Sequence, residues 1–308
     1  MSKYKPSLLI KREWAMDLLE LKAIYKSGVN IIDYLVCRGV GRTDAIAISY
    51  DLQAGTYTAL ADENSTYIDE YTSEIAETLN TLGAGTESIM EAGVGEATTL
   101  ANVRRQLRFE PDSFGFDISL SRALFGQKYF NRKGRGSSSL FVGDMFSIPL
   151  ADDSVDIVYT SHSIEPNGGR EEDALSELYR VARKYLILYE PSYEMATNEG
   201  RQRMDHLGYV RGLPQVADKL GMNVSDYRLT KVCSNSLNPT AMLLIEKNKR
   251  ASGNRNVEYR CPNNGERLQL SHGCYWSESS LRIYPVVLGI PLLTPQHGII
   301  ATHYAEFI

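Results

Sequence analysis

A glycine-rich turn directly follows an acidic residue in the segment SIMEAGVGEATTL, residues 88–100. Gly93 and Gly95 let the chain turn sharply and let a ligand press against main-chain N–H groups. An amphipathic stretch follows, and the start of such a helix offers unpaired N–H donors to a ligand. Glu91 stands just before the turn, where a carboxylate suits a cationic group and repels a pyrophosphate. The turn therefore fits a positively charged ligand better than a dinucleotide.

Two aspartates end the next two apolar runs. Asp117 closes FGFDIS, where its carboxylate can accept hydrogen bonds from both hydroxyls of a ribose, and Asp144 lies in FVGDMF. A carboxylate at this third position can accept the amino group of an adenine while Met145 packs against the ring. Taken singly, an aspartate at a strand end is often a helix cap, and a glycine pair is often an ordinary turn. The ordered set of residues is what predicts a binding site.

Short apolar strands alternate with amphipathic helices from residue 88 onward, which predicts an α/β, Rossmann-like fold. We expect a mostly parallel, seven-stranded sheet with helices on both faces. The connection SNSLNP is too short for a helix, so the last two strands should form a hairpin with an antiparallel edge. The predicted strands are 88–93, 113–117, 139–143, 155–160, 184–190, 224–233 and 240–246, and the helices are 96–107, 119–131, 171–183 and 199–221.

We place this domain at residues 88–247, with an extension before it and a small module after it. Residues 1–87 are predicted as a helical extension with helices at 11–38 and about 64–82, separated by a lid. The polar segment KNKRASGNRN, residues 247–256, is predicted as a linker. A small β-rich module should follow at 257–308.

Residues 88–165 resemble the class I methyltransferases that use S-adenosylmethionine (SAM), and specifically the type-11 methyltransferase domain. The matching pieces are EAGVGEATT, GFDIS, GDMFSIPLADDSVDIVYTSHSIE and the later ARKYLILYEPS. In that family the first acid and the glycines hold the methionine part, the second acid holds the ribose and the third holds the adenine. A departure is Ala97, where the family often has a third glycine. The resemblance implies that SAM is the cofactor and that its ligands are Glu91, Gly93, Gly95, Asp117 and Asp144.

The stretch TSHSIEPNGG follows the fourth predicted strand and should face the cofactor crevice, because ligands bind at the carboxyl ends of the strands in such sheets. Methyl transfer from a sulfonium depends mainly on positioning, but a hydroxyl acceptor must also lose its proton. His162 is the candidate general base. Its alternative role is to cap a turn or to contact the adenine. Glu165 and Asn167 are candidate substrate residues, with a turn or cap role as the alternative.

A second candidate segment is SYDLQAGTYT, residues 49–58, which lies where this fold usually carries a lid. Aromatic and amide side chains there could exclude water and shape an acceptor pocket. The alternative is an ordinary loop over the sheet edge. The lid residues that we predict are Tyr50, Gln53 and Tyr57.

The C-terminal module resembles the small zinc-ribbon protein that activates several tRNA and protein methyltransferases. The resemblance rests on the Cys261–Pro262 pair, Leu268 and YPVVLGIPLL, residues 284–293. The metal-bearing family has two cysteine pairs, and structural zinc needs four ligands. Only Cys261 and Cys274 remain here, and His272 would still leave the set short. We therefore expect no metal and interpret both cysteines as vestigial ligands or core thiols.

Composition narrows the function further. The net charge of −5 argues against nucleic acid as a partner, because an acidic surface repels phosphate backbones. No apolar run is long enough to span a membrane, and four sparse cysteines fit reduced thiols, so we expect a cytoplasmic protein. Oligomerisation is left open.

Three functions compete. The first is methyl transfer to a small-molecule or glycan-type acceptor, on oxygen. SHSIEPNGGRE departs from the quinone-biosynthesis enzymes, which argues against a quinone precursor. The second is a methyltransferase that acts on tRNA or protein, and the third is a SAM-binding scaffold without turnover. A nicotinamide oxidoreductase is disfavoured by Glu91.

Overall fold

The computed structural model describes residues 17–247 and 257–308, and the chain forms two compact units, 1–54 and 55–308. The first unit holds helices α1 (Leu18–Lys26), α2 (Ile31–Val36) and α3 (Arg42–Leu52). Its small core consists of Leu21, Ile31, Leu35, Val40 and Ala45.

The prediction of one helix over 11–38 is wrong in its described part, and residues 11–16 lie outside the described residues. The chain breaks after α1 because Gly28 has a φ of +81° and Asn30 caps α2. The Asn30 side chain accepts the N–H groups of Ile32 and Asp33 at 3.0 and 3.3 Å. A short polar side chain at this position commonly starts a new helix.

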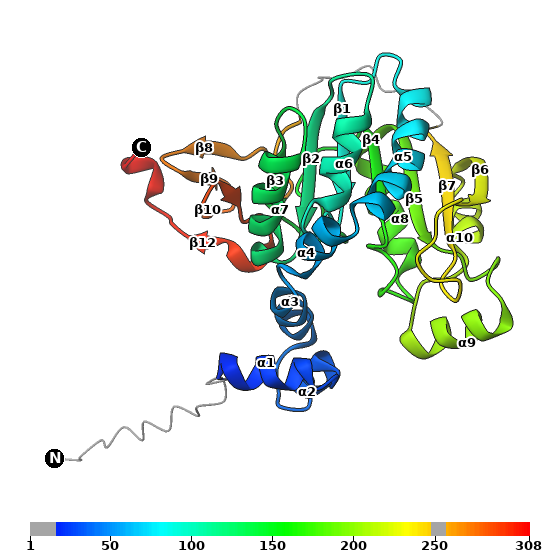
Figure 1. The fold of residues 1–308 in the computed structure, drawn as a ribbon. Coiled ribbons are helices and arrows are strands. Elements are labelled where there is room, and N and C mark those ends of the chain that lie inside the picture. The colour runs from blue at the N-terminus through cyan, green and yellow to red at the C-terminus, as the bar shows by residue number, and fades with distance from the viewer. Residues whose placement is uncertain (1–16, 248–256) are drawn as a thin grey trace. The chain divides into compact units, whose positions relative to one another are not determined.

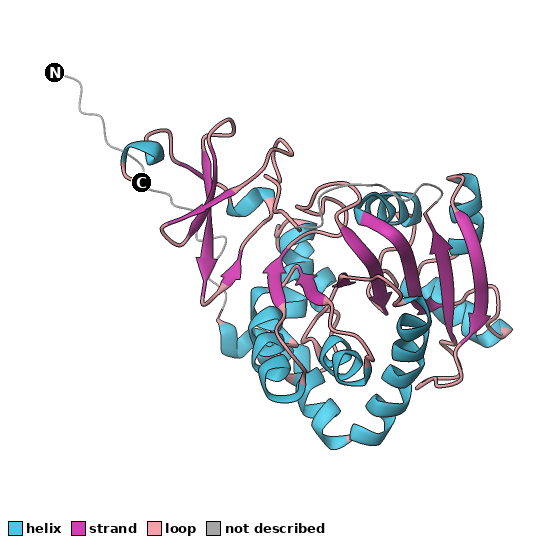
Figure 2. Cartoon of the chain, turned by 90° about the horizontal axis from the view of Figure 1, so that it is seen from above, coloured by secondary structure: helices cyan, strands magenta, loops and turns pink. Residues whose placement is uncertain are grey.

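The second unit is built on a seven-stranded sheet, as predicted, with the order β3-β2-β1-β4-β5-β7-β6. The strands lie side by side in Figure 2. The first five are parallel, and β7 pairs antiparallel with both β5 and β6, which confirms the expected edge hairpin. The strands are β1 (Ser88–Ala92), β2 (Asp112–Asp117), β3 (Ser139–Val142), β4 (Val155–Ser161), β5 (Ala182–Pro191), β6 (Asn223–Leu229) and β7 (Thr240–Glu246).

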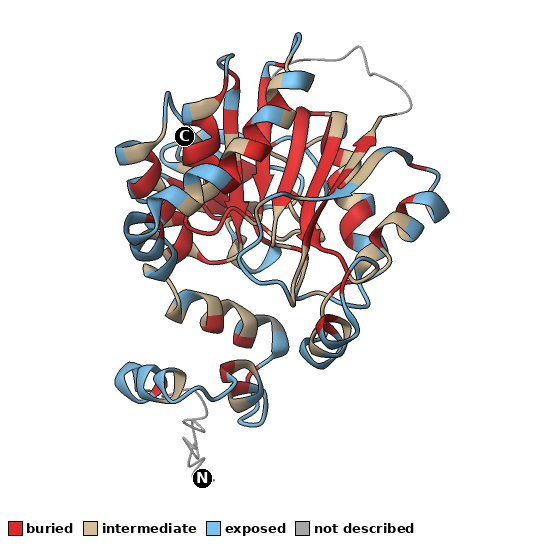
Figure 3. Ribbon diagram, turned by 45° about the vertical axis from the view of Figure 1, so that its right-hand side comes forward, coloured by how far each residue is buried: buried red, intermediate tan, exposed pale blue. Residues whose placement is uncertain are grey.

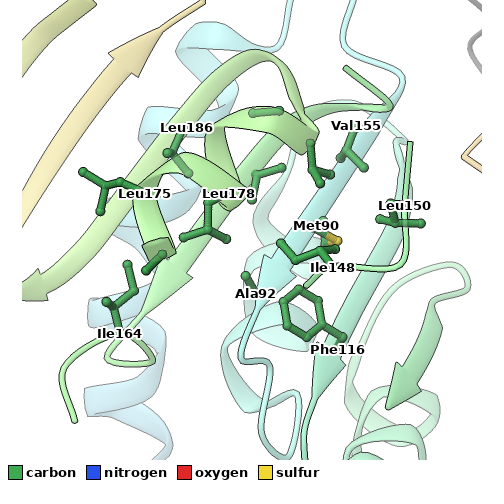
Figure 4. Close-up of a cluster of buried hydrophobic side chains, with 14 of the residues drawn as sticks. Met90, Ala92, Phe116, Ile148, Leu150, Val155, Ile164, Leu175, Leu178 and Leu186 are labelled. Atoms are coloured by element: carbon green, nitrogen blue, oxygen red, sulfur yellow. The ribbon is translucent and has the colours of Figure 1, made fainter. Parts of the chain in front are cut away.

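Helices cover both faces of this sheet, and each face has its own apolar core (Figure 1). The helices α5, α6 and α7 contribute to one core, and α8 and α10 contribute to the other. Figure 4 shows Met90, Leu178 and Leu186 in the second of these cores. The helices are α4 (Thr56–Glu63), α5 (Ser65–Leu82), α6 (Thr98–Gln106), α7 (Leu120–Lys133), α8 (Glu171–Val181), α9 (Asn198–Leu207) and α10 (Leu213–Lys219).

Two segments differ from their predicted structure. The helix expected over 199–221 is split into α9 and α10, because Gly208 and Gly212 have φ values of +65° and +67° and Pro214 stands at the start of α10. The segment 49–58, for which a lid and an ordinary loop were the two alternatives, lies mostly in helices α3 and α4. Gly55, with a φ of +96°, caps the second of these helices. Glycine is the residue that adopts this conformation without strain.

The C-terminal module is a small antiparallel β-sheet that packs against strand β3. The main-chain N–H of Leu293 donates to the carbonyl of Val142 at 2.8 Å, and Leu292 forms a parallel bridge to the same residue. Tyr284 and Leu293 are fully buried in the core of the main domain. The strands are β8 (Gln269–Ser271), β9 (Cys274–Ser277), β10 (Arg282–Val287), β11 (Ile290–Pro291) and β12 (Ile299–Ile300), followed or interrupted by short 3₁₀ turns at Pro295–His297 and Tyr304–Glu306.

The resemblance of this module to a zinc ribbon is not confirmed. Among residues 17–247 and 257–308, no group of three or more His, Cys, Asp or Glu side chains is arranged to hold a metal ion. Cys261 is buried with its sulfur 3.3 Å from the hydroxyl of Tyr284, and Cys274 is half-buried. Most of the predicted linker, 248–256, lies outside the described residues. Within the described part of the chain, none of the helices is long and apolar enough to cross a bilayer.

The C-terminal module shares a hydrophobic core with the seven-stranded sheet, so a substitution in the module should change the stability of the protein. Burial is greatest along the central strands (Figure 3), and Leu293 extends this core from the C-terminal module. We expect Leu293→Ala to lower the free energy of unfolding by about 2–5 kcal/mol, because it leaves a cavity in a fully buried site. The exposed Leu288 gives the matched control, Leu288→Ala, which should change stability by less than about 0.5 kcal/mol. Urea unfolding followed by circular dichroism measures both, and equal stabilities would contradict the shared core.

Candidate active site

The carboxyl ends of β1, β2 and β3 meet at one edge of the sheet, because these strands are parallel neighbours. The glycine turn follows β1, and Asp117 ends β2. The carboxylate of Asp117 accepts the N–H of Gly95 at 3.0 Å and that of Ser119 at 2.9 Å. The predicted glycine turn and the predicted ribose-binding acid are therefore in direct contact.

Arg122, which the sequence analysis missed, lies beside this pair. Its guanidinium would be 3.2 Å from a Cβ atom at Gly95, whose φ is +52°. Burial raises the pKa of the Asp117 carboxyl, and the positive charge of Arg122 opposes that rise. Arg122 is itself buried, in the first turn of α7. A basic residue five positions after a strand-end aspartate was the available signal.

Gly93 is where three loops come together. Its φ is +70°, and a Cβ atom there would lie 2.3 Å from Ser163 Cβ and 3.5 Å from Met145 Cε. The hydroxyl of Ser163 also donates to the carbonyl of Ala92 at 2.7 Å. The turn after β1, the segment after β3 and the segment after β4 thus pack against each other, and only glycine fits at their meeting point.

Asp144, two residues past β3, is half-buried and accepts the N–H of Phe146 at 2.9 Å. This contact is a turn contact and not the helix cap that the sequence analysis gave as the alternative role, because the described chain starts no helix between β3 and β4. It engages one carboxylate oxygen, Oδ1, of Asp144.

Glu91 lies beneath the glycine turn and is almost completely buried, with 2% exposure. The hydroxyl of Tyr159 donates to its carboxylate at 3.0 Å. Burial raises the pKa of Glu91 to about 8, and the hydrogen bonds from Tyr159 and from the main chain of Leu100 only partly oppose this rise. Tyr159 was missed, although it is the residue that pairs with Glu91 in the parallel register of β1 and β4.

His162 begins the segment after β4 with a φ of +53°, which is uncommon for a residue other than glycine. Its Nδ1 lies 2.8 Å from the Glu165 carboxylate, and its Nε2 lies 2.9 Å from the hydroxyl of Thr240. Burial lowers the pKa of His162, but the carboxylates of Glu165 and Glu190 outweigh it and leave the pKa above its usual value. Glu165 therefore orients the ring and favours its protonated form.

Glu190, at the end of β5, holds the segment after β4. Its carboxylate accepts the N–H groups of Ser163, Ile164 and Glu165 at 3.0–3.1 Å. Burial raises the pKa of Glu190 to about 7, while His162 opposes the rise. The predicted Asn167 donates from its side chain to the carbonyl of Ile164 at 3.3 Å, which is a turn contact.

The three predicted lid residues belong to different units. Tyr50 lies in α3 and Gln53 directly follows it, both in the unit of residues 1–54. Tyr57 lies in the first turn of α4, in the second unit. The guanidinium carbon of Arg122 is 4.7 Å from the centre of the Tyr57 ring. Tyr57 is therefore connected to the Gly95 and Asp117 pair through Arg122.

A cavity of about 490 Å³ lies apart from these residues. It is lined by residues 147–152, by Glu177 and Arg180, and by residues 260–265. None of the predicted site residues lines it.

Comparison with known proteins adds a family match. The model of a methyltransferase domain matches residues 90–188, which is less than half of the chain. No curated protein matches the sequence.

Several solved structures are similar to part of the chain. A magnesium protoporphyrin IX methyltransferase from Synechocystis PCC 6803 with bound SAH is 14% identical, with a TM-score of 0.47 over 59% of this chain and 84% of that one. A putative sarcosine dimethylglycine methyltransferase from Galdieria sulphuraria is 14% identical, with a TM-score of 0.47 over 60% and 87%. A SAM-dependent methyltransferase from Aquifex aeolicus is 14% identical, with a TM-score of 0.45 over 62% and 97%.

The family model spans the chain from β1 to β5, which includes the glycine turn, Asp117 and the segment that carries His162. These are the elements on which the sequence resemblance rested. Residues 90–188 of this chain are therefore similar to a methyltransferase domain.

Proposed function

We propose that this protein transfers the methyl group of SAM to a hydroxyl oxygen of a small-molecule or glycan-type acceptor. The observation that carries the proposal is the meeting of the glycine turn, Asp117 and Met145 at one sheet edge, next to the segment that carries a carboxylate-paired histidine. When bound, SAM supplies an electrophilic methyl group on a positively charged sulfur.

The donor set at this edge fits such a cofactor. Asp117 would accept the ribose hydroxyls, because its carboxylate is anchored to the glycine turn that the ligand must approach. Asp144 would accept the adenine amino group, and Met145 would pack on the ring. Gly93 and Gly95 would present bare main chain to the methionine part, with Glu91 beneath them.

His162 would remove the proton of the acceptor hydroxyl. Glu165 engages Nδ1, which leaves Nε2 as the nitrogen that faces a hydroxyl, at present that of Thr240. An acceptor hydroxyl would take the place of the Thr240 hydroxyl at Nε2. The pairing with Glu165 stabilises the imidazolium that results, as a general base requires. Glu165 and Asn167 are proposed to line the acceptor side, and Tyr57 is proposed to form part of the wall of the cofactor site.

The first test is binding of the demethylated product, S-adenosylhomocysteine (SAH), measured by isothermal titration calorimetry. Asp117→Ala should raise the dissociation constant at least about 100-fold, because hydrogen bonds to a charged acceptor contribute about 1.5–3 kcal/mol each. Asp112 is exposed at the opposite end of β2, so Asp112→Ala should bind like the wild type. The proposal fails if the wild type binds neither SAM nor SAH, or if Asp117→Ala binds normally.

A second test uses the raised pKa of Glu91. With a pKa of about 8, this carboxyl is mostly protonated at pH 7. A cation held against the glycine turn favours the ionised form and lowers the pKa, so SAM binding at pH 7 should release up to about one proton. The apparent binding enthalpy should therefore differ between buffers of low and high ionisation enthalpy. Glu91→Gln should remove this difference, and a wild-type enthalpy independent of the buffer would refute the linkage.

A third test addresses the acceptor chemistry. His162→Ala should lower the turnover of a hydroxyl acceptor by about 100- to 10,000-fold while SAH affinity changes little. In the wild type the rate should rise with pH as His162 loses its proton, with a midpoint above the usual histidine value. SAH formation across a panel of sugars and small alcohols provides the assay. Unchanged turnover in the variant would exclude His162 as the base, and tight SAH binding with no turnover on any acceptor would favour a scaffold.

A further inference from the structure

Glu96, the residue directly after the glycine turn, is buried with 1% exposure, and its carboxylate binds the start of another helix. Its two oxygens accept the main-chain N–H groups of Gly55 at 2.9 Å, Tyr57 at 3.3 Å and Thr58 at 2.7 Å. These residues are the N-cap and the first turn of α4, which packs against α6 and α7 (Figure 1). A side chain of the proposed cofactor loop thus accepts hydrogen bonds from a helix terminus that lies 38 to 41 residues earlier in the chain.

The chemistry of this contact makes it specific. The first N–H groups of a helix have no partner within the helix and carry its positive end, which favours a carboxylate. Hydrogen bonds to an ionised acceptor are about twice as strong as neutral ones. Gly55 is fixed from a second side, because its φ is +96° and a Cβ atom there would lie 3.1 Å from the ring of Phe125. The start of α4 is therefore held at a defined place.

The position of the start of α4 is important because the first turn of this helix carries Tyr57. Tyr57 stacks on the guanidinium of Arg122 at 4.7 Å. Arg122 in turn lies beside Gly95, and its charge acts on the carboxyl of Asp117. Contacts therefore link Glu96 through the first turn of α4 to Arg122, whose charge acts on the acid proposed to bind the ribose.

We propose that Glu96 is a positioning residue that holds the first turn of α4 against the glycine turn. Tyr57 and Arg122 then keep the carboxylate of Asp117 in the position in which it binds the cofactor. The inference rests on the proposed SAM site. It differs from a mobile lid, because residues 55–58 then form a fixed wall of the cofactor site in the free protein as well.

The first measurement is hydrogen exchange of the cofactor-free protein, read by mass spectrometry on a peptide that covers residues 55–58. Glu96→Gln keeps the volume of the side chain but loses its charge and replaces one acceptor oxygen with a donor. Exchange in this peptide should become at least about tenfold faster, while peptides from β4 and β5 stay unchanged. Glu63, the exposed last residue of α4, provides the control Glu63→Gln, which should exchange like the wild type.

The second measurement is SAH affinity of the same variants. Glu96→Gln should raise the dissociation constant about tenfold and Glu63→Gln should not. Wild-type exchange in Glu96→Gln overturns the inference, and so does faster exchange with unchanged SAH affinity. If the wild type itself binds no SAH, the proposed function fails and the cofactor part of the inference fails with it, while the exchange data still decide whether Glu96 holds α4.

A second variant covers the case in which Glu96→Gln does not fold. Gly55→Ala disturbs the same turn from the side of Phe125 and leaves Glu96 intact. It should reproduce the faster exchange and the weaker SAH binding. Normal SAH affinity together with fast exchange in Gly55→Ala would overturn the positioning role.

Discussion

The hydrogen bond from the Gly95 main chain to the Asp117 carboxylate connects the two strands on which the rest of the site depends. A glycine turn can take many conformations, and its N–H groups recognise a ligand only when the turn is held in one of them. Asp117 holds it from the neighbouring strand, and the parallel register of β1 and β2 fixes the separation of the two ends. The acid that is proposed to bind the ribose thus also shapes the loop that is proposed to bind the methionine part.

Buried glutamates stabilise the same edge of the sheet, and each is satisfied in a different way. Glu91 accepts a tyrosine hydroxyl, Glu96 accepts the first turn of a helix, and Glu190 accepts three N–H groups of the segment after β4. Burying a carboxylate is costly unless hydrogen bonds compensate it. At Glu91 the hydrogen bonds from Tyr159 and from the main chain of Leu100 compensate burial only in part, and the pKa rises to about 8. Burial raises the pKa of Glu190 only to about 7, because the charge of His162 opposes the rise, together with hydrogen bonds from Thr160 and Ile164.

The sequence was sufficient for features that depend on neighbouring residues. Short apolar runs predicted all seven strands of the sheet and the hairpin at its edge, and the closely spaced glycines predicted the turn after β1. Each of these patterns involves only residues that are close together in the sequence. It was insufficient for contacts between distant segments. Tyr159 and Glu190 gain their roles from strand register and from contacts between distant segments, which no short motif encodes. The split of the 199–221 helix was in principle readable, since Gly208, Gly212 and Pro214 all interrupt the pattern.

The C-terminal module covers the lateral edge of the sheet at β3, which the sequence motifs did not reveal. Strand β3 would otherwise end the sheet with unpaired main-chain groups, which natural proteins usually cover. The module covers it at Val142, and it binds again on the far side of the following loop, where Arg260 donates its N–H to the carbonyl of Pro149 at 2.8 Å. Asp144 and Met145 lie between these two attachments. A loop fixed at both ends loses less conformational entropy when it binds a ligand. The module thus holds the loop that carries Asp144 and Met145 at both ends, although it contributes none of the residues that we propose to touch the cofactor.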